Sequence, residues 1–279
     1  MRRIMVDRVR EAVREAAARA NFELGADTVK ALEAAREREE SAVGKEILER
    51  LLENAEIART ERIPMCQDTG LAVLFVELGQ EVLLEGGEFN AALEEGIRLG
   101  YEEAYLRKSV CHPFTRANTG DNTPVIIHTE IVPGDRLKIW VVPKGGGSEN
   151  MSRLFMLPPS AGWQGIKKRI VETVVEAGPN PCPPTILGIG IGGNFEGCAL
   201  LAKKALLRPA GMPHPDPDIA RKEQEILEEV NASGVGPQGL GGRVTSLAAH
   251  ILMMPCHIAS LPVAINLQCH ANRHVEIEL

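Results

Sequence analysis

The spacing of the apolar residues changes near Ile63, and this change limits the folds that the chain can adopt. Before it, Val6, Val9 and Val13 recur every three or four residues, which is the spacing of an amphipathic helix. After it, short apolar runs alternate with helical segments and with Gly and Pro, which is typical of strands and turns. The sequence therefore predicts an α/β fold: a helical N-terminal region, then mixed α/β structure in which helices flank the sheets.

The apolar runs after Ile63 predict strands, and the segments of helical spacing between them predict helices. Strands are expected over residues 71–78, 125–132, 137–142 and 185–191. Helices are expected over residues 89–107, 163–177, 195–207 and 219–231.

The charge and composition of the chain disfavour two classes of partner. Its 279 residues carry 31 Lys and Arg against 38 Asp and Glu, a net charge of −7, and only 4% of them are aromatic. A nucleic-acid binder needs basic surfaces and aromatic stacking platforms, so no nucleic acid is expected as a partner. The N-terminus lacks the apolar stretch of a secretory signal, and no run approaches 18 apolar residues. We therefore expect a cytoplasmic protein without a membrane partner.

The segment 180-NPCPPTILGIGIGG-193 contains the pattern G-x-G-x-x-G at Gly188, Gly190 and Gly193. In a dinucleotide-binding fold, such a turn leads through a helix to a strand that ends in an acidic residue about 20 residues later. Here the predicted helix leads to the proline-rich loop 208-RPAGMPHPDPD-218. An NAD-dependent oxidoreductase is therefore disfavoured. We interpret the glycines as allowing close backbone approach to a buried group, with the next helix directing its N-terminus at something negative.

Six cysteines are present, at positions 66, 111, 182, 198, 256 and 269, and none forms a C-x-x-C pair. In a reducing compartment disulfides are not expected, and a free cysteine is often a core residue. Cys66, Cys182 and Cys269 differ from the others because each lies where an apolar run meets a polar loop. Three thiolates on an iron–sulfur cluster leave one iron open as a Lewis acid, which can polarise a C–OH bond for loss of water. The alternative is a zinc site that uses cysteines with His270 and His274.

Other loops carry candidate substrate-binding groups. The segment 144-KGGGSENMS-152 offers successive N–H groups that could form a carboxylate-binding concavity, or it is a flexible loop without a ligand. Arg107 could form a forked pair with a carboxylate, or it is a surface arginine. His257 could carry a proton near neutral pH, or it is a hydrogen-bonded core histidine.

With these motifs, the sequence resembles the alpha subunit of two-subunit class I (iron–sulfur) fumarate hydratases and of the related L-tartrate dehydratases. The resemblance covers residues 63–279 and lies in six motifs that occur in one order. They are 65-MCQDTG-70, 118-NTGDNTP-124, 145-GGGSENMS-152, 182-CPPTILGIGIGG-193, 236-GPQGLGG-242 and 257-HIASLPVAINLQCHANRH-274.

The resemblance implies a [4Fe-4S] cluster held by Cys66, Cys182 and Cys269, with one open iron site. It implies catalytic roles for Asp68 and His257, with Asp68 in proton transfer. It also implies substrate contacts from Gln67, Asp68, Arg107, Gly147, Asn150, Met151 and Ser152. The chain is then expected to form one fumarase alpha-type domain over residues 1–279, with helices over 1–60 and a cluster-binding α/β region over 61–279.

The expected reaction is the reversible dehydration of malate to fumarate, and the alternative is the dehydration of L-tartrate to oxaloacetate. Single-chain members of the family continue into a second domain that adds Arg, Lys and Thr groups to the site. We therefore expect a separate beta subunit as partner, which completes the active site over a small dicarboxylate substrate.

Overall fold

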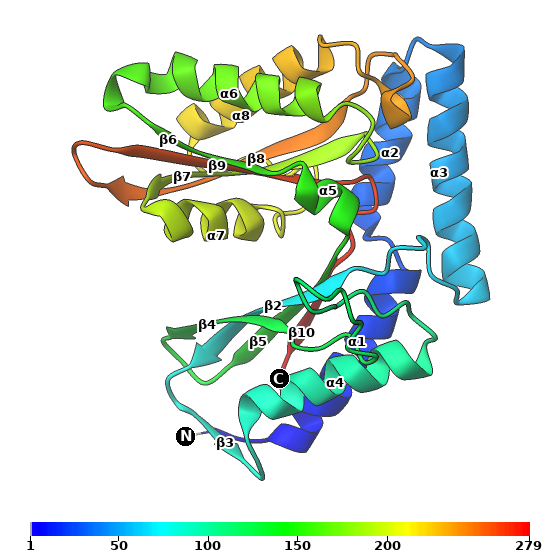
Figure 1. The fold of residues 1–279 in the computed structure, drawn as a ribbon, viewed down its shortest axis with the longest axis vertical. Helices are drawn as coiled ribbons and strands as arrows, with labels where there is room; N and C mark the ends of the chain where they lie inside the picture. Colours follow the sequence, from blue (N-terminus) through cyan, green and yellow to red (C-terminus); the bar gives the residue numbers. More distant parts are fainter. Residues whose placement is uncertain (1) are drawn as a thin grey trace. The chain divides into compact units, whose positions relative to one another are not determined.

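The computed structural model describes residues 2–279, and the chain folds into two compact units (Figure 1). Unit 1 contains residues 2–24, Asn54–Gly146 and Arg273–Leu279, and unit 2 contains Gly25–Glu53 and Gly147–Asn272. Each unit is therefore assembled from segments that are far apart in the sequence. The single fumarase alpha-type domain expected over the whole chain stays a prediction.

Unit 1 is a four-stranded sheet with two helices packed on it. Its elements are β1 (Arg2–Met5), α1 (Val6–Phe22), β2 (Leu71–Gly79), β3 (Val82–Glu85), α4 (Phe89–Glu103), β4 (Ile126–Val132), β5 (Leu137–Lys144) and β10 (Val275–Glu278). The strand order is β10-β5-β2-β4, with β2 antiparallel to β5 and parallel to β4. Alternate strand residues such as Leu74, Val76 and Ile139 form one buried cluster with α1 and α4. β1 and β3 form a separate parallel pair.

Unit 2 is a mixed sheet covered by helices on both faces (Figure 1). Its elements are α2 (Ala26–Arg38), β6 (Arg153–Leu157), α6 (Gly162–Ala177), β7 (Thr185–Gly193), α7 (Phe195–Ala205), α8 (Pro217–Asn231), β8 (Ser246–Cys256) and β9 (Leu261–Gln268), with short turns η1 (Pro159–Ala161) and η2 (Pro237–Gly239). The strand order is β6-β9-β7-β8, with β7 parallel to β8 and antiparallel to β9. Helices α6 and α8 bury the apolar side chains of one face, and α7 packs against the other.

The predicted fold class is confirmed, and so are most of the predicted elements. The N-terminal region consists of α1, α2 and α3 (Ala42–Glu61), and the rest is mixed α/β. The four predicted strands correspond to β2, β4, β5 and β7, and the four predicted helices to α4, α6, α7 and α8. The predicted helix over 89–107 ends early, at Glu103, because Tyr105 has a left-handed backbone with φ 53°. None of the helices in residues 2–279 combines the length and apolar composition needed to span a bilayer.

The glycines of β7 have a different role from the one expected. A Cβ at Gly188 would lie 2.1 Å from the carbonyl oxygen of Ala202, and one at Gly190 would lie 2.0 Å from that of Cys198. Both glycines therefore let α7 pack directly against β7, in contact distances that no larger residue permits. The N-terminus of α7 follows the last residue of β7, at the opposite end of this strand from Cys182. The N-terminus of this helix therefore lies away from Cys182, and the group that the glycines allow to approach is the helix itself.

Candidate functional site

One end of the unit 2 sheet brings two of the predicted cysteines together. Cys182 lies just before β7 and Cys269 just after β9, and these strands are antiparallel neighbours, with Ile186 opposite Gln268. His270, next to Cys269, contacts the carbonyl oxygen of Cys182 with its backbone nitrogen at 3.4 Å and with Nδ1 at 3.0 Å. We call this end of the sheet the Cys182 end. Cys182 is exposed and Cys269 is half-buried, so both thiols are accessible.

The short segment after β5 also reaches the Cys182 end, although part of it is helical. The segment expected to be a carboxylate-binding concavity or a flexible loop contains the one-turn helix α5 (Gly146–Asn150). A Cβ at Gly147 would lie 3.2 Å from the carbonyl oxygen of Asn180, two residues before Cys182. The hydroxyl of Ser152 accepts a hydrogen bond from the backbone of Leu267 at 3.1 Å, near the end of β9. Met151 packs partly into the core of unit 2, while Asn150 is exposed.

In unit 1, Cys66, Gln67 and Asp68 lie in the loop before β2. The thiol of Cys66 is half-buried and lies 3.5 Å from Oε1 of Gln67. The carboxylate of Asp68 accepts hydrogen bonds from the backbone N–H of Gly70 at 2.9 Å and from that of Gly146 at 2.7 Å. The glycine segment therefore does bind a carboxylate, as the sequence indicated, but this carboxylate belongs to the chain itself.

A buried arginine fixes the backbone of this loop. Arg273 is 1% exposed, and it donates one hydrogen bond to the carbonyl oxygen of Asp68 at 2.5 Å and another to Oδ1 of Asn21 at 3.1 Å. Tyr101, also fully buried, donates to the carbonyl oxygen of Thr69 at 2.7 Å, and burial raises the pKa of its phenol. The loop is thus held by side chains distant in the sequence. The motif search missed Arg273 as a structural residue because nothing in its local sequence indicates a contact with Asn21.

Two predicted site residues lie in exposed positions. Arg107 is exposed, and its carbonyl oxygen accepts a hydrogen bond from Thr69 at 2.8 Å. His257 lies in the turn between β8 and β9, at the end of the sheet opposite Cys182, and it is exposed. The nine residues of β7 separate the two ends by about 27 Å. Unit 2 therefore does not bring His257 to its own Cys182 and Cys269, and we call this the His257 end.

The remaining cysteines were expected to be packing residues, which is confirmed for Cys198 and wrong for Cys256. Cys198 is buried against α7 and β9 neighbours, and burial raises the pKa of its thiol. Cys256 is exposed at the His257 end, and Cys111 is half-buried in the loop that follows α4.

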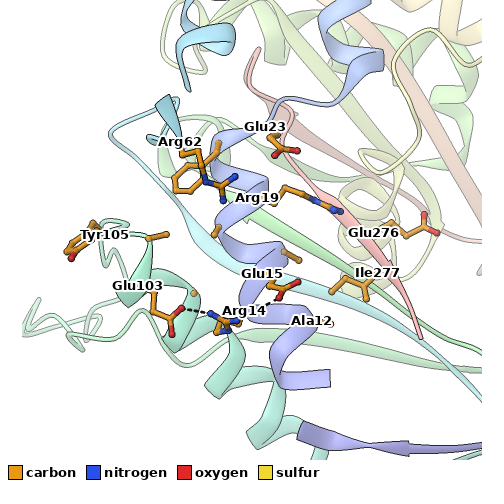
Figure 2. Close-up of a pocket in the computed structure, with 15 residues that line it drawn as sticks. Ala12, Arg14, Glu15, Arg19, Glu23, Arg62, Glu103, Tyr105, Glu276 and Ile277 are labelled. Atoms are coloured by element: carbon orange, nitrogen blue, oxygen red, sulfur yellow. Dashed lines mark hydrogen bonds and ion pairs between the residues drawn. The ribbon is translucent and has the colours of Figure 1, made fainter. Parts of the chain in front are cut away.

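A cavity of about 830 Å³ in unit 1 is lined by none of the predicted site residues (Figure 2). It is an open groove beside α1, with charged side chains at its rim. Arg14 forms an ion pair with Glu103 at 2.5 Å, and Arg62 lies 5.5 Å from the ring centre of Phe22. These interactions pair some of the charged side chains of the groove with one another. Acidic residues, Glu15, Glu23 and Glu276, also line it.

The donor chemistry at the Cys182 end fits a thiolate-bound metal cluster. All six cysteines are free thiols, and the three predicted ligands are each at least partly accessible in loops next to strand ends. Cys182 and Cys269 belong to unit 2, and Cys66 belongs to unit 1. Among residues 2–279, no group of three or more His, Cys, Asp or Glu side chains is arranged to hold a metal ion. Of the three predicted ligands, unit 2 thus contains Cys182 and Cys269, and unit 1 contains Cys66.

Each unit thus has candidate groups in loops next to strands: two thiols in unit 2, and a thiol and a carboxylate in unit 1. Comparison with known sequences identifies the family of the chain. The chain belongs to the fumarate hydratase (fumerase) family, whose model matches residues 10–278. This establishes the resemblance that the six motifs predicted, over almost the whole chain.

Several relatives align along nearly their full length. A protein of Methanocaldococcus jannaschii, provisionally named L(+)-tartrate dehydratase subunit alpha, is 44% identical over 275 residues, which is 96% of this chain and 94% of the relative. The L(+)-tartrate dehydratase subunit alpha of Escherichia coli (strain K12) is 33% identical over 272 residues, 96% of this chain and 89% of the relative. The protein of the same name from Shigella sonnei has the same identity and coverage.

Proposed function

We propose that this chain is the alpha subunit of an iron–sulfur hydro-lyase that reversibly removes water from a four-carbon 2-hydroxy dicarboxylate. Its membership of the fumarate hydratase family supports the hydro-lyase class. The names of its relatives support a two-subunit enzyme, because each is called a subunit alpha. The observation that carries the proposal is that the loops of Cys182 and Cys269 lie side by side at one end of the unit 2 sheet.

In this proposal, Cys66, Cys182 and Cys269 hold a [4Fe-4S] cluster. When bound, such a cluster supplies an open iron that acts as a Lewis acid on the substrate hydroxyl.

The residues of the chain then have distinct tasks. The carboxylate of Asp68, which accepts hydrogen bonds from the N–H groups of Gly70 and Gly146, would hold or transfer a proton. Gln67 and Arg107 would bind the substrate carboxylates, with the Arg107 guanidinium free of the fold core to do so. Gly147 and Asn150 are exposed at the Cys182 end and would line the substrate pocket, next to Met151 and Ser152. The catalytic role expected for His257 stays a prediction, and we assign no step to it.

Two substrates remain candidates, and each has its own support. The family description supports malate and fumarate, which was the sequence-based expectation. The names of the relatives support L-tartrate. We further propose that a separate beta subunit completes the site, so the isolated alpha subunit is expected to have little activity.

The first test is the iron and acid-labile sulfide content of the chain after anaerobic purification. We expect about four of each per wild-type chain, because an open-site [4Fe-4S] cluster has that composition. Cys182→Ala is expected to lose most of both, whereas Cys256→Ala, the matched change at the His257 end, is expected to keep them. Zinc or no metal in anaerobically reconstituted wild-type protein would overturn the proposal. Adding the beta subunit and comparing malate with L-tartrate then identifies the substrate.

A further inference from the structure

Hydrogen bonds from other segments fix the Cys182 loop. The loop contains the pair 183-PP-184, and prolines have no backbone N–H to donate. The loop therefore depends on donors from elsewhere in the chain. The structure provides them from two segments: the glycine-rich loop 236-GPQGLGG-242 and His270.

Gln238 provides two of these donors to one acceptor. Its backbone N–H and its side-chain Nε2 each donate to the carbonyl oxygen of Pro183, both at 2.8 Å. To do so, Gln238 has a left-handed backbone with φ 52° and ψ 18°, which costs free energy for a residue other than Gly or Asn. Its Nε2 also lies 3.4 Å from Nδ1 of His270. A half-buried glutamine in a strained conformation thus contacts both cysteine-bearing loops.

The contacts of His270 depend on its tautomer. When Nδ1 of His270 carries the proton, it donates to the carbonyl oxygen of Cys182 at 3.0 Å, and the Nε2 of Gln238 at 3.4 Å is then a neighbour of Nδ1 and not its hydrogen-bond donor. The backbone N–H of His270 approaches the same oxygen at 3.4 Å. Because His270 directly follows Cys269, these two contacts connect one cysteine loop to the other across the β7–β9 pair.

The loop that carries Gln238 is itself fixed at its far end. The carboxylate of Glu39, 1% exposed, accepts hydrogen bonds from the backbone N–H of Arg243 at 3.0 Å and from that of Val244 at 2.8 Å. A Cβ at Gly239 would lie 2.5 Å from Pro179, so this loop also lies directly against the segment that leads to Cys182. Gln238 is therefore presented on a rigid support.

We propose that Gln238 and His270 are positioning residues that hold Cys182 at a fixed separation from Cys269. The proposal rests on the proposed function in taking these two cysteines as cluster ligands. Gln238 fixes the Pro183 carbonyl, and His270 fixes the Cys182 carbonyl, so the Cys182 thiol is already placed before any metal binds. Such preorganisation reduces the ordering that a ligand loop must undergo when it binds its group.

The first experiment uses the full chain without a cluster, in a background with Cys66, Cys111 and Cys256 changed to Ser. The probe is dibromobimane, which becomes fluorescent when it joins two neighbouring thiols, here Cys182 and Cys269. We expect efficient cross-linking in the background protein. Gln238→Gly keeps the backbone N–H and suits the left-handed conformation but removes the amide, and we expect its cross-linking rate to fall about threefold to tenfold. Gln224→Ala, an exposed glutamine on α8, is the matched control.

A second pair of variants tests whether the N–H donor of the His270 side chain is needed. An Asn side chain presents an N–H near the place of histidine Nδ1, whereas Phe presents none. His270→Asn is therefore expected to keep most of the cross-linking, and His270→Phe to lose it by a similar factor to Gln238→Gly. Urea unfolding of each variant shows whether the fold remains intact at the temperature of the assay. Wild-type cross-linking in both Gln238→Gly and His270→Phe would overturn the proposal.

Reconstitution separates this proposal from the proposed function. In protein with all cysteines restored, Gln238→Gly is expected to take up iron more slowly and to show an altered electron paramagnetic resonance spectrum of the reduced cluster. A purely structural role that leaves the ligands in place would change neither. If the wild-type chain takes up no cluster, the proposed function fails, and the cross-linking result still decides whether Gln238 and His270 position the two thiols.

Discussion

The two ends of the unit 2 sheet differ in the hydrogen bonding of their loops and in the exposure of their apolar side chains. At the Cys182 end, loops 182–184, 236–245 and 268–270 are joined by hydrogen bonds from Gln238, His270 and the buried Glu39. At the His257 end, large apolar side chains are left at the surface, with Met253 52% and Ile258 92% exposed. Buried polar contacts fix the conformation of loops, and a binding or catalytic site needs its groups in fixed positions. We therefore expect the functional site at the Cys182 end.

The largest effect on this comparison is expected from Glu39→Ala. The change removes a carboxylate that accepts hydrogen bonds from four backbone N–H groups, of Glu40, Ser41, Arg243 and Val244, and leaves the buried N–H of Val244 without a partner. Unfolding in urea is expected to show a loss of about 3 kcal/mol. The matched variant is Glu40→Ala, whose side chain forms only an exposed ion pair with Arg243, and it is expected to change stability by less than about 0.5 kcal/mol. Equal effects of both changes would show that the Cys182 end is not held through Glu39.

A smaller effect is expected from the pH dependence of stability through His250, in the middle of β8. Burial, followed by the nearby charge of Arg208, lowers the pKa of His250 from 6.5 to about 4. The folded protein therefore keeps His250 neutral while the unfolded chain binds a proton below pH 6.5. This contribution to stability is fully present above pH 6.5 and is lost as the pH falls towards 4, by about 2–3 kcal/mol in total.

His250→Gln removes this titration, so the decrease in unfolding free energy between pH 6.5 and pH 4 is expected to be smaller than in wild type by about that amount. The measurement is urea unfolding at several pH values in this range. Parallel pH profiles for the two proteins would contradict the prediction and would mean that His250 is protonated in the folded state.

The smallest effect is expected at the His257 end. Ile258→Ser replaces a side chain that is 92% exposed, so its effect on unfolding free energy is expected to be below about 0.5 kcal/mol. A loss above 1 kcal/mol that grows with protein concentration would instead indicate that this end is covered by another chain in solution. The His257 end would then be an interface with another chain, and the difference between the two ends would not be one of loop rigidity.

Much of the fold follows from local patterns in the sequence. Val6, Val9 and Val13 predicted α1, and all three are buried on its inner face. The apolar run before Gly193 predicted β7, and its glycines were correctly linked to close approach, although the approaching group is α7. Strands β1, β3, β6, β8, β9 and β10 were not predicted, because short runs such as 275–278 alternate too briefly to be told from loops.

The site could be predicted only in part, for a physical reason. The cysteines were found because each lies next to both an apolar run and polar residues, which is a local property. The groups that hold their loops were not found, because each acts over a long sequence distance. Glu39 binds the backbone of Val244, Arg273 binds Asn21, and Asp68 binds Gly146. A single sequence records no such pairing.

The division of the chain into interleaved segments has a consequence for its synthesis. Strand β10, at residues 275–278, pairs with β5, and the backbone of Leu279 exchanges hydrogen bonds with that of Leu137. The sheet of unit 1 therefore cannot form completely until residues 275–278 have been synthesised. Until then, one edge of β5 has no partner strand. Exposed strand edges promote aggregation, and long-range pairings slow folding. A nascent chain of this protein would thus depend on protection of that edge, and loss of residues 273–279 would leave the β5 edge open to association.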